Sequence, residues 1–381
     1  MLILHVTRDH SPAHCGGTST AVSELTAALS EIDMKGRVVS FEQWRPRSNR
    51  KGSPLRDEQH QGLAVARLST PDQLEKARTW ALKAKPDLVL VHHEMLWEFA
   101  KEIATLWGVP CVLVVHVFQA AMNRVRGVTE RTMSFVAQEK AFVEADAVIT
   151  TSQAVYLEIL EMYPALDGRI HVRGLGTSRV AQGARTVFEP TVAFSGRFDS
   201  IKRLPLLLAA MEEVLETLPD TRLILIGGNP GNAKLERRWH KRLKSETSAK
   251  LQSQLEICGW LDSDEVWTQL EQASVVVNPS LYETFGLSLL EAMAGGLAVV
   301  TSPAGGLSEL VQDGHNGLIV DSDDPSQWSR TLIALLRDPQ RALELGKAAR
   351  NSVVGKRLWS TVAPTWKTLF LKLCGEVKSK S

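Results

Sequence analysis

The sequence has few cysteines and no long apolar run. Its four cysteines, among 381 residues, show no paired spacing, which argues against a disulfide framework and a zinc site. No stretch approaches the ~18 consecutive apolar residues that span a bilayer. The first residues also lack a basic segment followed by an apolar core. We therefore expect a cytoplasmic protein.

An excess of charge of one sign is also missing. The chain carries 44 basic and 43 acidic side chains, a formal net charge of +1, so no global field favours nucleic acid or a strongly acidic partner. Basic residues gather in two places, a loop at residues 44–51 that continues to Arg56, and the group Arg124, Arg126 and Arg131. A solvated surface is the ordinary interpretation of both clusters.

A dinucleotide-binding fingerprint is absent as well. An expected strand at residues 2–7 leads to Gly16 and Gly17 and then to a helix with N-cap candidates at residues 18–20, but the spacing does not match G-x-G-x-x-G. This argues against a nicotinamide-dependent dehydrogenase. The two glycines would let the backbone approach a ligand, or would form a tight turn that packs strand against helix.

Apolar runs and helical periodicities alternate along the whole chain. We expect strands at residues 2–7, 37–41, 64–68, 87–92, 111–117, 147–151 and 170–173, and again at 191–194, 221–228, 255–261, 275–277, 297–300 and 317–320. The alternation predicts α/β domains with mostly parallel sheets that are covered on both faces. The length suits two domains, at residues 1–175 and 191–356, joined by a linker at 176–190 that is rich in glycine and small polar residues.

The stretch at residues 278–306 is predicted to run from a strand, through a loop with Glu283, into a helix opened by Gly286 that carries Glu291. Free N–H groups at the start of a helix suit phosphate oxygens. Glu291 lies roughly 7 Å further along the helix axis, about the reach from a phosphate to a ribose, and a carboxylate can accept two hydroxyl donors. The alternative is an exposed helix residue and a first-turn acid favoured by the helix dipole.

The E-x7-E pair Glu283 and Glu291, with Phe285, Gly286 and the glycine turn at residues 304–306, resembles the retaining GT-B glycosyltransferases of the GT4 type, the glycosyl transferases group 1. The resemblance implies a GT-B fold, with two Rossmann-like doubly wound domains facing each other across a cleft. It implies that the first domain binds the acceptor and the second the nucleotide sugar, and that a helix at 357–376 packs back onto the first domain.

The resemblance also implies roles for individual residues. Arg197 and Lys202 would hold the donor diphosphate, where fixed cations stabilise the charge of the leaving group. Glu283 is assigned to hydroxyls of the donor sugar, and His116, at a strand end, to a sugar hydroxyl or to a structural role. The expected nucleotide contacts are Gly16, Gly17, Trp260, Leu261, Phe285, Gly286, Leu287 and Glu291.

Three details stay open at this stage. Trp260 could stack on the nucleobase or cap the core. His92, His93 and Glu94 end another strand without a fixed role. Asp324 and Pro325 are better explained as a helix N-terminus than as part of a metal site.

We therefore expect a retaining glycosyltransferase that moves a sugar from a nucleotide-diphosphate sugar to a hydroxyl of a glycan, lipid-linked or small-molecule acceptor. UDP or GDP is the favoured carrier, and no cofactor or metal is assigned. By resemblance, the basic clusters permit peripheral contact with the inner face of an anionic membrane. The alternatives are a GT-B-type nucleotide-sugar epimerase and a non-catalytic scaffold. The sequence names neither the sugar, the acceptor nor the oligomeric state.

Overall fold

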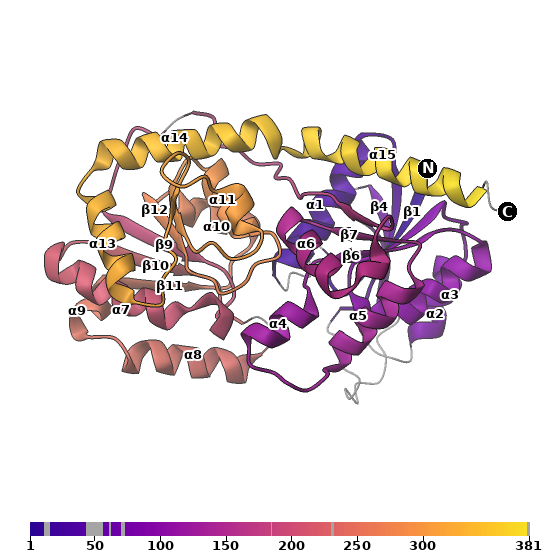
Figure 1. Cartoon of the computed structure of the whole chain (residues 1–381), viewed down its shortest axis with the longest axis horizontal. Coiled ribbons are helices and arrows are strands. Elements are labelled where there is room, and N and C mark those ends of the chain that lie inside the picture. The colour runs from indigo at the N-terminus through magenta and orange to yellow at the C-terminus, as the bar shows by residue number, and fades with distance from the viewer. Residues whose placement is uncertain are drawn as a thin grey trace. The chain divides into compact units, whose positions relative to one another are not determined.

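The computed structural model describes residues 1–10, 16–42, 56–60, 62–69, 73–183, 185–229 and 232–378. The chain divides into two compact units: unit 1 comprises Met1–Gly176 and Trp359–Ser381, and unit 2 comprises Thr177–Leu358. Each unit combines a sheet with surrounding helices (Figure 1). Cys15 and the basic loop at 44–51 lie outside the described residues.

Unit 1 is built on an eight-stranded sheet with the order β3-β4-β2-β1-β5-β6-β7-β8. All neighbouring strands are parallel except β3 and β4. The strands are β1 (Leu2–Thr7), β2 (Lys35–Ser40), β3 (Arg56–His60), β4 (Leu63–Arg67), β5 (Leu88–Val91), β6 (Cys111–Val115), β7 (Ala147–Thr150) and β8 (Ile170–Val172). The helices between them are α1 (Gly17–Glu31), α2 (Leu74–Ala81), η2 (Glu94–Leu96), α3 (Trp97–Trp107), α4 (Gln119–Val125), α5 (Met133–Glu144), α6 (Gln153–Met162) and η3 (Pro164–Leu166).

The central and edge strands of this sheet differ in composition for a physical reason. Every residue of β5 and β6 is buried, because helices cover both faces, and both strands are continuous apolar runs. By contrast, β3 lies at the edge and is mostly exposed and polar. The expectation that Arg56 belongs to a basic loop is therefore wrong: it begins β3, which pairs with β4 through backbone groups and carries no apolar pattern.

The last helix, α15 (Trp359–Lys378), belongs to unit 1. The indole Nε1 of Trp359 donates to Glu24 Oε2 on α1 at 2.8 Å, and that of Trp366 donates to Gly174 O at 3.0 Å. Lys367 Nζ donates to Ile32 O at 2.8 Å. The α15 ribbon, yellow in Figure 1, accordingly runs beside α1.

Unit 2 has a parallel six-stranded sheet with the order β11-β10-β9-β12-β13-β14. The strands are β9 (Thr191–Ser195), β10 (Arg222–Ile226), β11 (Leu255–Gly259), β12 (Val275–Asn278), β13 (Ala298–Thr301) and β14 (Leu318–Ile319). The helices are η4 (Ser200–Lys202), α7 (Leu204–Thr217), α8 (Ala233–Ser245), α9 (Ala249–Gln254), α10 (Ser263–Leu270), α11 (Leu287–Ala294), α12 (Leu307–Leu310), α13 (Pro325–Leu336) and α14 (Pro339–Lys356).

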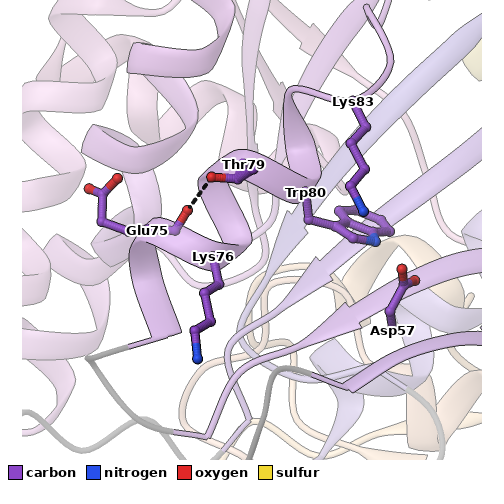
Figure 2. A pocket seen from close by; sticks show the side chains of 6 residues that line it. All are labelled: Asp57, Glu75, Lys76, Thr79, Trp80 and Lys83. Atoms are coloured by element: carbon purple, nitrogen blue, oxygen red, sulfur yellow. Dashed lines mark hydrogen bonds between the residues drawn. The ribbon is translucent and has the colours of Figure 1, made fainter.

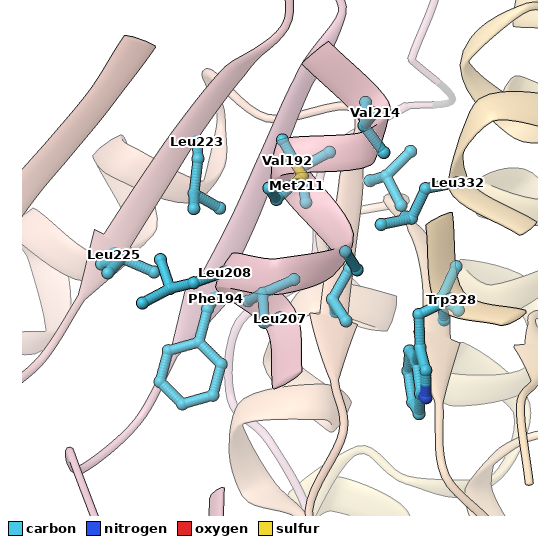
Figure 3. Packing of buried hydrophobic residues seen from close by; sticks show 14 of the residues in the cluster. Val192, Phe194, Leu207, Leu208, Met211, Val214, Leu223, Leu225, Trp328 and Leu332 are labelled. Atoms are coloured by element: carbon cyan, nitrogen blue, oxygen red, sulfur yellow. The ribbon is translucent and has the colours of Figure 1, made fainter. Parts of the chain in front are cut away.

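The core of unit 2 lies where α7 packs against the sheet and α13. Apolar residues recur along α7 at helical spacing, which gives it one buried stripe. Figure 3 shows this stripe meeting side chains of β9, β10 and α13. The labelled residues are Val192, Phe194, Leu207, Leu208, Met211, Val214, Leu223, Leu225, Trp328 and Leu332.

Several local expectations are corrected. Helix α1 is capped by Gly16, with a φ of 128°, and residues 18–20 lie inside the helix. The expected helix at 234–251 is two helices, because the Ser248 side chain caps α9 by accepting from Leu251 N at 3.1 Å. Helix α4 carried no apolar periodicity long enough to predict it. Asp324 does cap α13 with Pro325 as its first residue, as expected.

Across the described ranges, every helix is too short or too polar to serve as a membrane span.

Candidate functional site

The strand order of unit 2 creates a switch point between β9 and β12. From β9 the chain moves outward to β10 and β11, whereas from β12 it moves the other way to β13 and β14. Loops that leave the carboxyl ends of such a strand pair part from each other, and ligands of doubly wound sheets bind there. The loop after β9 carries Arg197 and Lys202, and the loop after β12 carries Glu283.

Lys202 and Glu283 form an ion pair that joins these two loops. Lys202 Nζ contacts Glu283 Oε1, and both side chains are only 15% exposed. The loops are also joined through the backbone, because Leu281 N donates to Ile201 O at 2.8 Å. The pair is 81 residues apart in sequence, and sequence reasoning did not anticipate it.

Ser280, which sequence reasoning also missed, contacts the same carboxylate oxygen of Glu283 as Lys202 does. Its hydroxyl lies 3.0 Å from Glu283 Oε1 and 2.5 Å from Asn278 Oδ1. One hydroxyl proton therefore faces two acceptors. Asn278 is the last residue of β12, so the end of the strand positions the hydroxyl that contacts the carboxylate.

Glycines let the backbone pass close beneath this loop. Gly305 has a φ of +54°, and a Cβ there would overlap Glu283 O; a Cβ on Gly306 would lie 2.6 Å from Thr284 O. Gly286, with a φ of +97°, is the N-cap of α11, where a Cβ would lie 2.5 Å from Leu307 Cδ2. A larger residue at Gly305 or Gly306 would displace the backbone of the loop that carries Glu283.

Helix α11 begins directly after Gly286, as expected, and Glu291 lies in its second turn, half-buried. The Phe285 ring is buried, with the Arg357 guanidinium 5.5 Å from its centroid. Phe285 can therefore meet a ligand through its backbone rather than its ring. The first N–H groups of α11 lack intrahelical partners, as at any helix start.

Arg197 is exposed, and its loop is fixed through glycines. Gly196 N donates to Ile226 O at 3.0 Å, and Phe198 N donates to Gly228 O at 3.2 Å. A Cβ on Gly227 would overlap Gly196 O. Among the described residues, no carboxylate forms an ion pair with the Arg197 guanidinium, so it is available to an anion.

Trp260 and Leu261 follow β11 at the edge of the sheet, and both are half-buried. In the part of unit 2 that the structure describes, Trp260 is not among the residues that pack on the hydrophobic core. This weakens the interpretation of Trp260 as a core cap. Cys258 in the same strand is half-buried too, whereas Cys111 in β6 is fully buried.

In unit 1, His116 follows β6 and contacts a second histidine. Its Nε2 lies 3.1 Å from His92 Nδ1, and His92 Nε2 lies 3.1 Å from His5 Nδ1 in β1. Burial lowers the pKa of His116 to about 4 and that of His5 to about 3, and it holds the pKa of His92 well below its usual value. His5 went unnoticed in the sequence, because its neighbours across the sheet cannot be read from its own strand.

The surrounding loop is held by amide side chains. Gln138 Nε2 donates to Val117 O at 2.8 Å, its Oε1 accepts from Gln119 N at 2.9 Å, and Gln119 Nε2 donates to the buried Glu94 at 2.9 Å. Gly16 and Gly17, at the start of α1, are partly or fully exposed.

A separate pocket of about 360 Å³ lies beside α2 in unit 1 (Figure 2). Its lining residues are Asp57, Glu75, Lys76, Thr79, Trp80 and Lys83. The Arg37 guanidinium lies 3.9 Å from the Trp80 ring centroid. None of the predicted site residues lines this pocket, so it is not the predicted donor site. Within the described ranges, no group of His, Cys, Asp or Glu side chains is arranged to hold a metal ion.

Comparison with known proteins places this geometry in a family. Residues 181–352 match the sequence model of the glycosyl transferases group 1, and residues 16–176 match that of the glycosyl transferase 4-like domain. The chain belongs to the group 1 glycosyltransferases. The two matches adjoin at the boundary between unit 1 and unit 2 of this glycosyltransferase.

Individual relatives agree with this assignment. The glycosyltransferase is 29% identical to alpha-maltose-1-phosphate synthase of Mycolicibacterium smegmatis, over 98% of this chain and 100% of that protein. Its structure resembles sucrose-phosphate synthase from Thermosynechococcus elongatus, with a TM-score of 0.79 and 21% identity over 99% and 100% of the two chains. It also resembles Anabaena Alr3699/HepE in complex with UDP-glucose, with a TM-score of 0.74 and 18% identity over 97% and 99%. The fold is GT-B, as expected from the sequence.

Proposed function

We propose that this glycosyltransferase moves a sugar from a nucleotide-diphosphate sugar to a hydroxyl group, with retention at the anomeric carbon. The observation that carries the proposal is the charge arrangement at the switch point of unit 2. An exposed guanidinium, Arg197, and an ammonium–carboxylate pair, Lys202 and Glu283, stand on the two loops that leave β9 and β12. A relative named for an alpha-linked sugar phosphate and a structural neighbour that binds UDP-glucose support the same chemistry.

In the proposed step, the bond between the anomeric carbon and the diphosphate oxygen breaks. The acceptor oxygen bonds to the same face of that carbon, and its proton passes to the leaving phosphate. The negative charge that gathers on the diphosphate is stabilised by Arg197 and Lys202. Because Lys202 is paired with Glu283 in this structure, the diphosphate takes the place of the carboxylate, and Glu283 turns to hydroxyl donors of the sugar.

The remaining contacts follow from the elements around this point. We assign the ribose to Glu291, the phosphates to Gly16, Gly17 and the backbone of residues 285–287, and the base to residues 260–261. UDP or GDP is the proposed carrier, and the step is written without a metal. Unit 1 supplies the acceptor contacts, with His116 binding a sugar hydroxyl.

The proposal includes a cytoplasmic location with peripheral contact at the inner face of an anionic membrane, and ion pairs at the basic cluster bear on that contact. Arg124 pairs with Glu158, and Arg131 pairs with Glu139. These ion pairs reduce the positive charge that the cluster offers to lipid headgroups. A membrane-bound fraction that is lost at 0.5 M salt would support the contact.

The direct test separates transfer from its two alternatives. The full chain is incubated with UDP- and GDP-sugars and a panel of hydroxyl acceptors, and the products are followed by NMR. If the protein is a transferase, nucleoside diphosphate is released only when an acceptor is present. The new glycosidic bond then has the same anomeric configuration as the donor. Release of a free epimerised sugar without acceptor would establish an epimerase. Absence of any turnover with tight nucleotide binding would indicate a scaffold.

A further inference from the structure

Three imidazole rings form a row at the carboxyl edge of the sheet of unit 1. His5 lies in β1, His92 follows β5, and His116 follows β6, and these three strands are neighbours in the sheet. The ring centroids of His5 and His92 are 5.4 Å apart with an interplanar angle of 4°. Those of His92 and His116 are 5.3 Å apart at 30°. Nitrogen atoms of successive rings are 3.1 Å apart in both cases.

The protons in this row are coupled. A neutral imidazole has one N–H donor and one acceptor nitrogen. Both nitrogens of His92 contact neighbouring rings, so each N···N contact needs one proton between its two nitrogens. Two arrangements of the protons satisfy both contacts. In one, His92 donates to His116 and accepts from His5, which leaves the proton of His116 on Nδ1. In the other, every donor and acceptor is reversed, and His116 Nδ1 is an acceptor.

All three rings are neutral near pH 7, as the placement of one proton in each N···N contact requires. Burial is the largest cause of the lowered pKa of each ring, and neighbouring histidines add repulsion: His10 acts on His5 and His92, and His93 acts on His116. Glu94, which follows β5 at this edge, accepts from Gln119. With three neutral rings, each of the two N···N contacts holds one proton.

We propose that His92 and His5 are positioning residues that tie the tautomer of His116 to their own tautomers, and that this coupling influences whether His116 donates to or accepts from a sugar hydroxyl. The functional consequence rests on the proposed glycosyl transfer, in which His116 contacts that hydroxyl. The tautomer coupling itself does not, because it requires no bound ligand. His5 acts through His92, and the contact that the structure shows for its Nδ1 is with His92.

The first experiment measures the coupling directly. The full chain is labelled with 15N-histidine, and long-range 1H–15N correlations at pH 7.5 distinguish the Nδ1–H and Nε2–H tautomers of His116, assigned with His116→Gln. We expect a single tautomer in the wild type and a mixture or the opposite tautomer in His5→Phe, which keeps an aromatic ring but removes both nitrogens. His171→Phe, in β8 of the same sheet, is the matched control and should leave His116 unchanged.

The second experiment uses a pair of variants at His92. A glutamine amide offers one donor and one acceptor and can bridge the neighbouring rings, whereas leucine cannot. We expect kcat to fall about five- to tenfold in His92→Leu, the worth of about one hydrogen bond, and to recover most of that loss in His92→Gln. The KM for the nucleotide sugar should stay within twofold in both variants, because His92 is not among the residues assigned to the nucleotide or the diphosphate.

An unchanged His116 tautomer in folded His5→Phe and His92→Leu would overturn the proposal, and so would equal losses of kcat in the two His92 variants. If His5→Phe does not fold, the tautomer in His92→Leu decides. A wild-type protein that binds no nucleoside diphosphate would instead remove the proposed function, while the spectra still decide the coupling.

Discussion

Unit 1 and unit 2 follow the same strand order, but the side chains at their switch points differ in charge. In unit 1, starting from β4, the order β4-β2-β1-β5-β6-β7 repeats that of β11-β10-β9-β12-β13-β14 in unit 2. At the switch point of unit 1, His5 within β1 and His92 after β5 are buried, and burial holds the pKa of both rings below the usual value. Those of unit 2 lead to Arg197, Lys202 and Glu283. The same fold places a binding site at the carboxyl edge of each sheet, and the side chains at that edge determine whether the site suits a phosphate or a hydroxyl group.

The largest expected effect comes from removing the cations of unit 2. Arg197→Ala and Lys202→Ala should each lower kcat by about 10²-fold or more, because each removes a fixed charge from the developing diphosphate. Arg330→Ala, an exposed arginine on α13, is the control and should leave kcat unchanged. Steady-state assays of nucleoside diphosphate release measure the effect. Near-normal turnover in both site variants would contradict the charge assignment in unit 2.

A glycine in unit 2 should matter almost as much. Gly305→Ala would push a Cβ into Glu283 O at a positive φ, and we expect a loss of about 2 kcal/mol or more in the free energy of unfolding. The melting temperature should fall by about 5 °C, with weaker nucleotide binding. Gly355→Ala, in α14 with open space where its Cβ would lie, should be neutral or slightly stabilising. Similar melting temperatures for the two variants would show that the loop tolerates displacement.

Glu291 tests the assignment of the ribose to unit 2. Glu291→Ala should raise the Kd for a nucleoside diphosphate about tenfold, since it removes hydrogen bonds to a charged acceptor. Glu344→Ala, an exposed carboxylate on α14, should leave that Kd unchanged. Isothermal titration calorimetry decides between these results. Equal affinity in wild type and Glu291→Ala would remove the ribose role.

The neutral histidines of unit 1 predict a smaller, pH-dependent effect. Their folded-state pKa values lie below the unfolded value near 6.5, so their contribution to stability is complete above pH 6.5 and is lost as the pH falls toward about 4. At pH 5.0 each such histidine costs about 1–2 kcal/mol relative to pH 7.5.

The melting temperature should therefore drop less between pH 7.5 and 5.0 in His5→Phe than in wild type. The titratable groups that act on His5 and its neighbour His92 are His10 and His116. The exposed His315 provides the control, His315→Gln, which should keep the wild-type difference. An equal drop in His5→Phe and wild type would mean that His5 is protonated in the folded protein.

The sequence predicts those parts of the site that are local along the chain. Gly286 before an apolar helix predicts the start of α11, and the apolar strand before Arg197 predicts the loop after β9. Contacts across the sheet are different, because they depend on strand order. The Lys202–Glu283 pair and the His5–His92 contact join residues 81 and 87 positions apart, and no local pattern records either. The polar edge strand β3 also lacks the apolar alternation on which strand prediction depends.

The central claim is that the switch point of unit 2 holds a nucleoside diphosphate. The most direct measurement is a thermal-shift titration of the full chain and Arg197→Ala with UDP, GDP, ADP, TDP and CMP, each with EDTA and with Mg²⁺. A ligand that binds the folded state raises the melting temperature by mass action. We predict that UDP or GDP stabilises the wild type in EDTA and that Arg197→Ala loses most of the shift. No shift at millimolar nucleotide, or an equal shift in Arg197→Ala, would contradict the account.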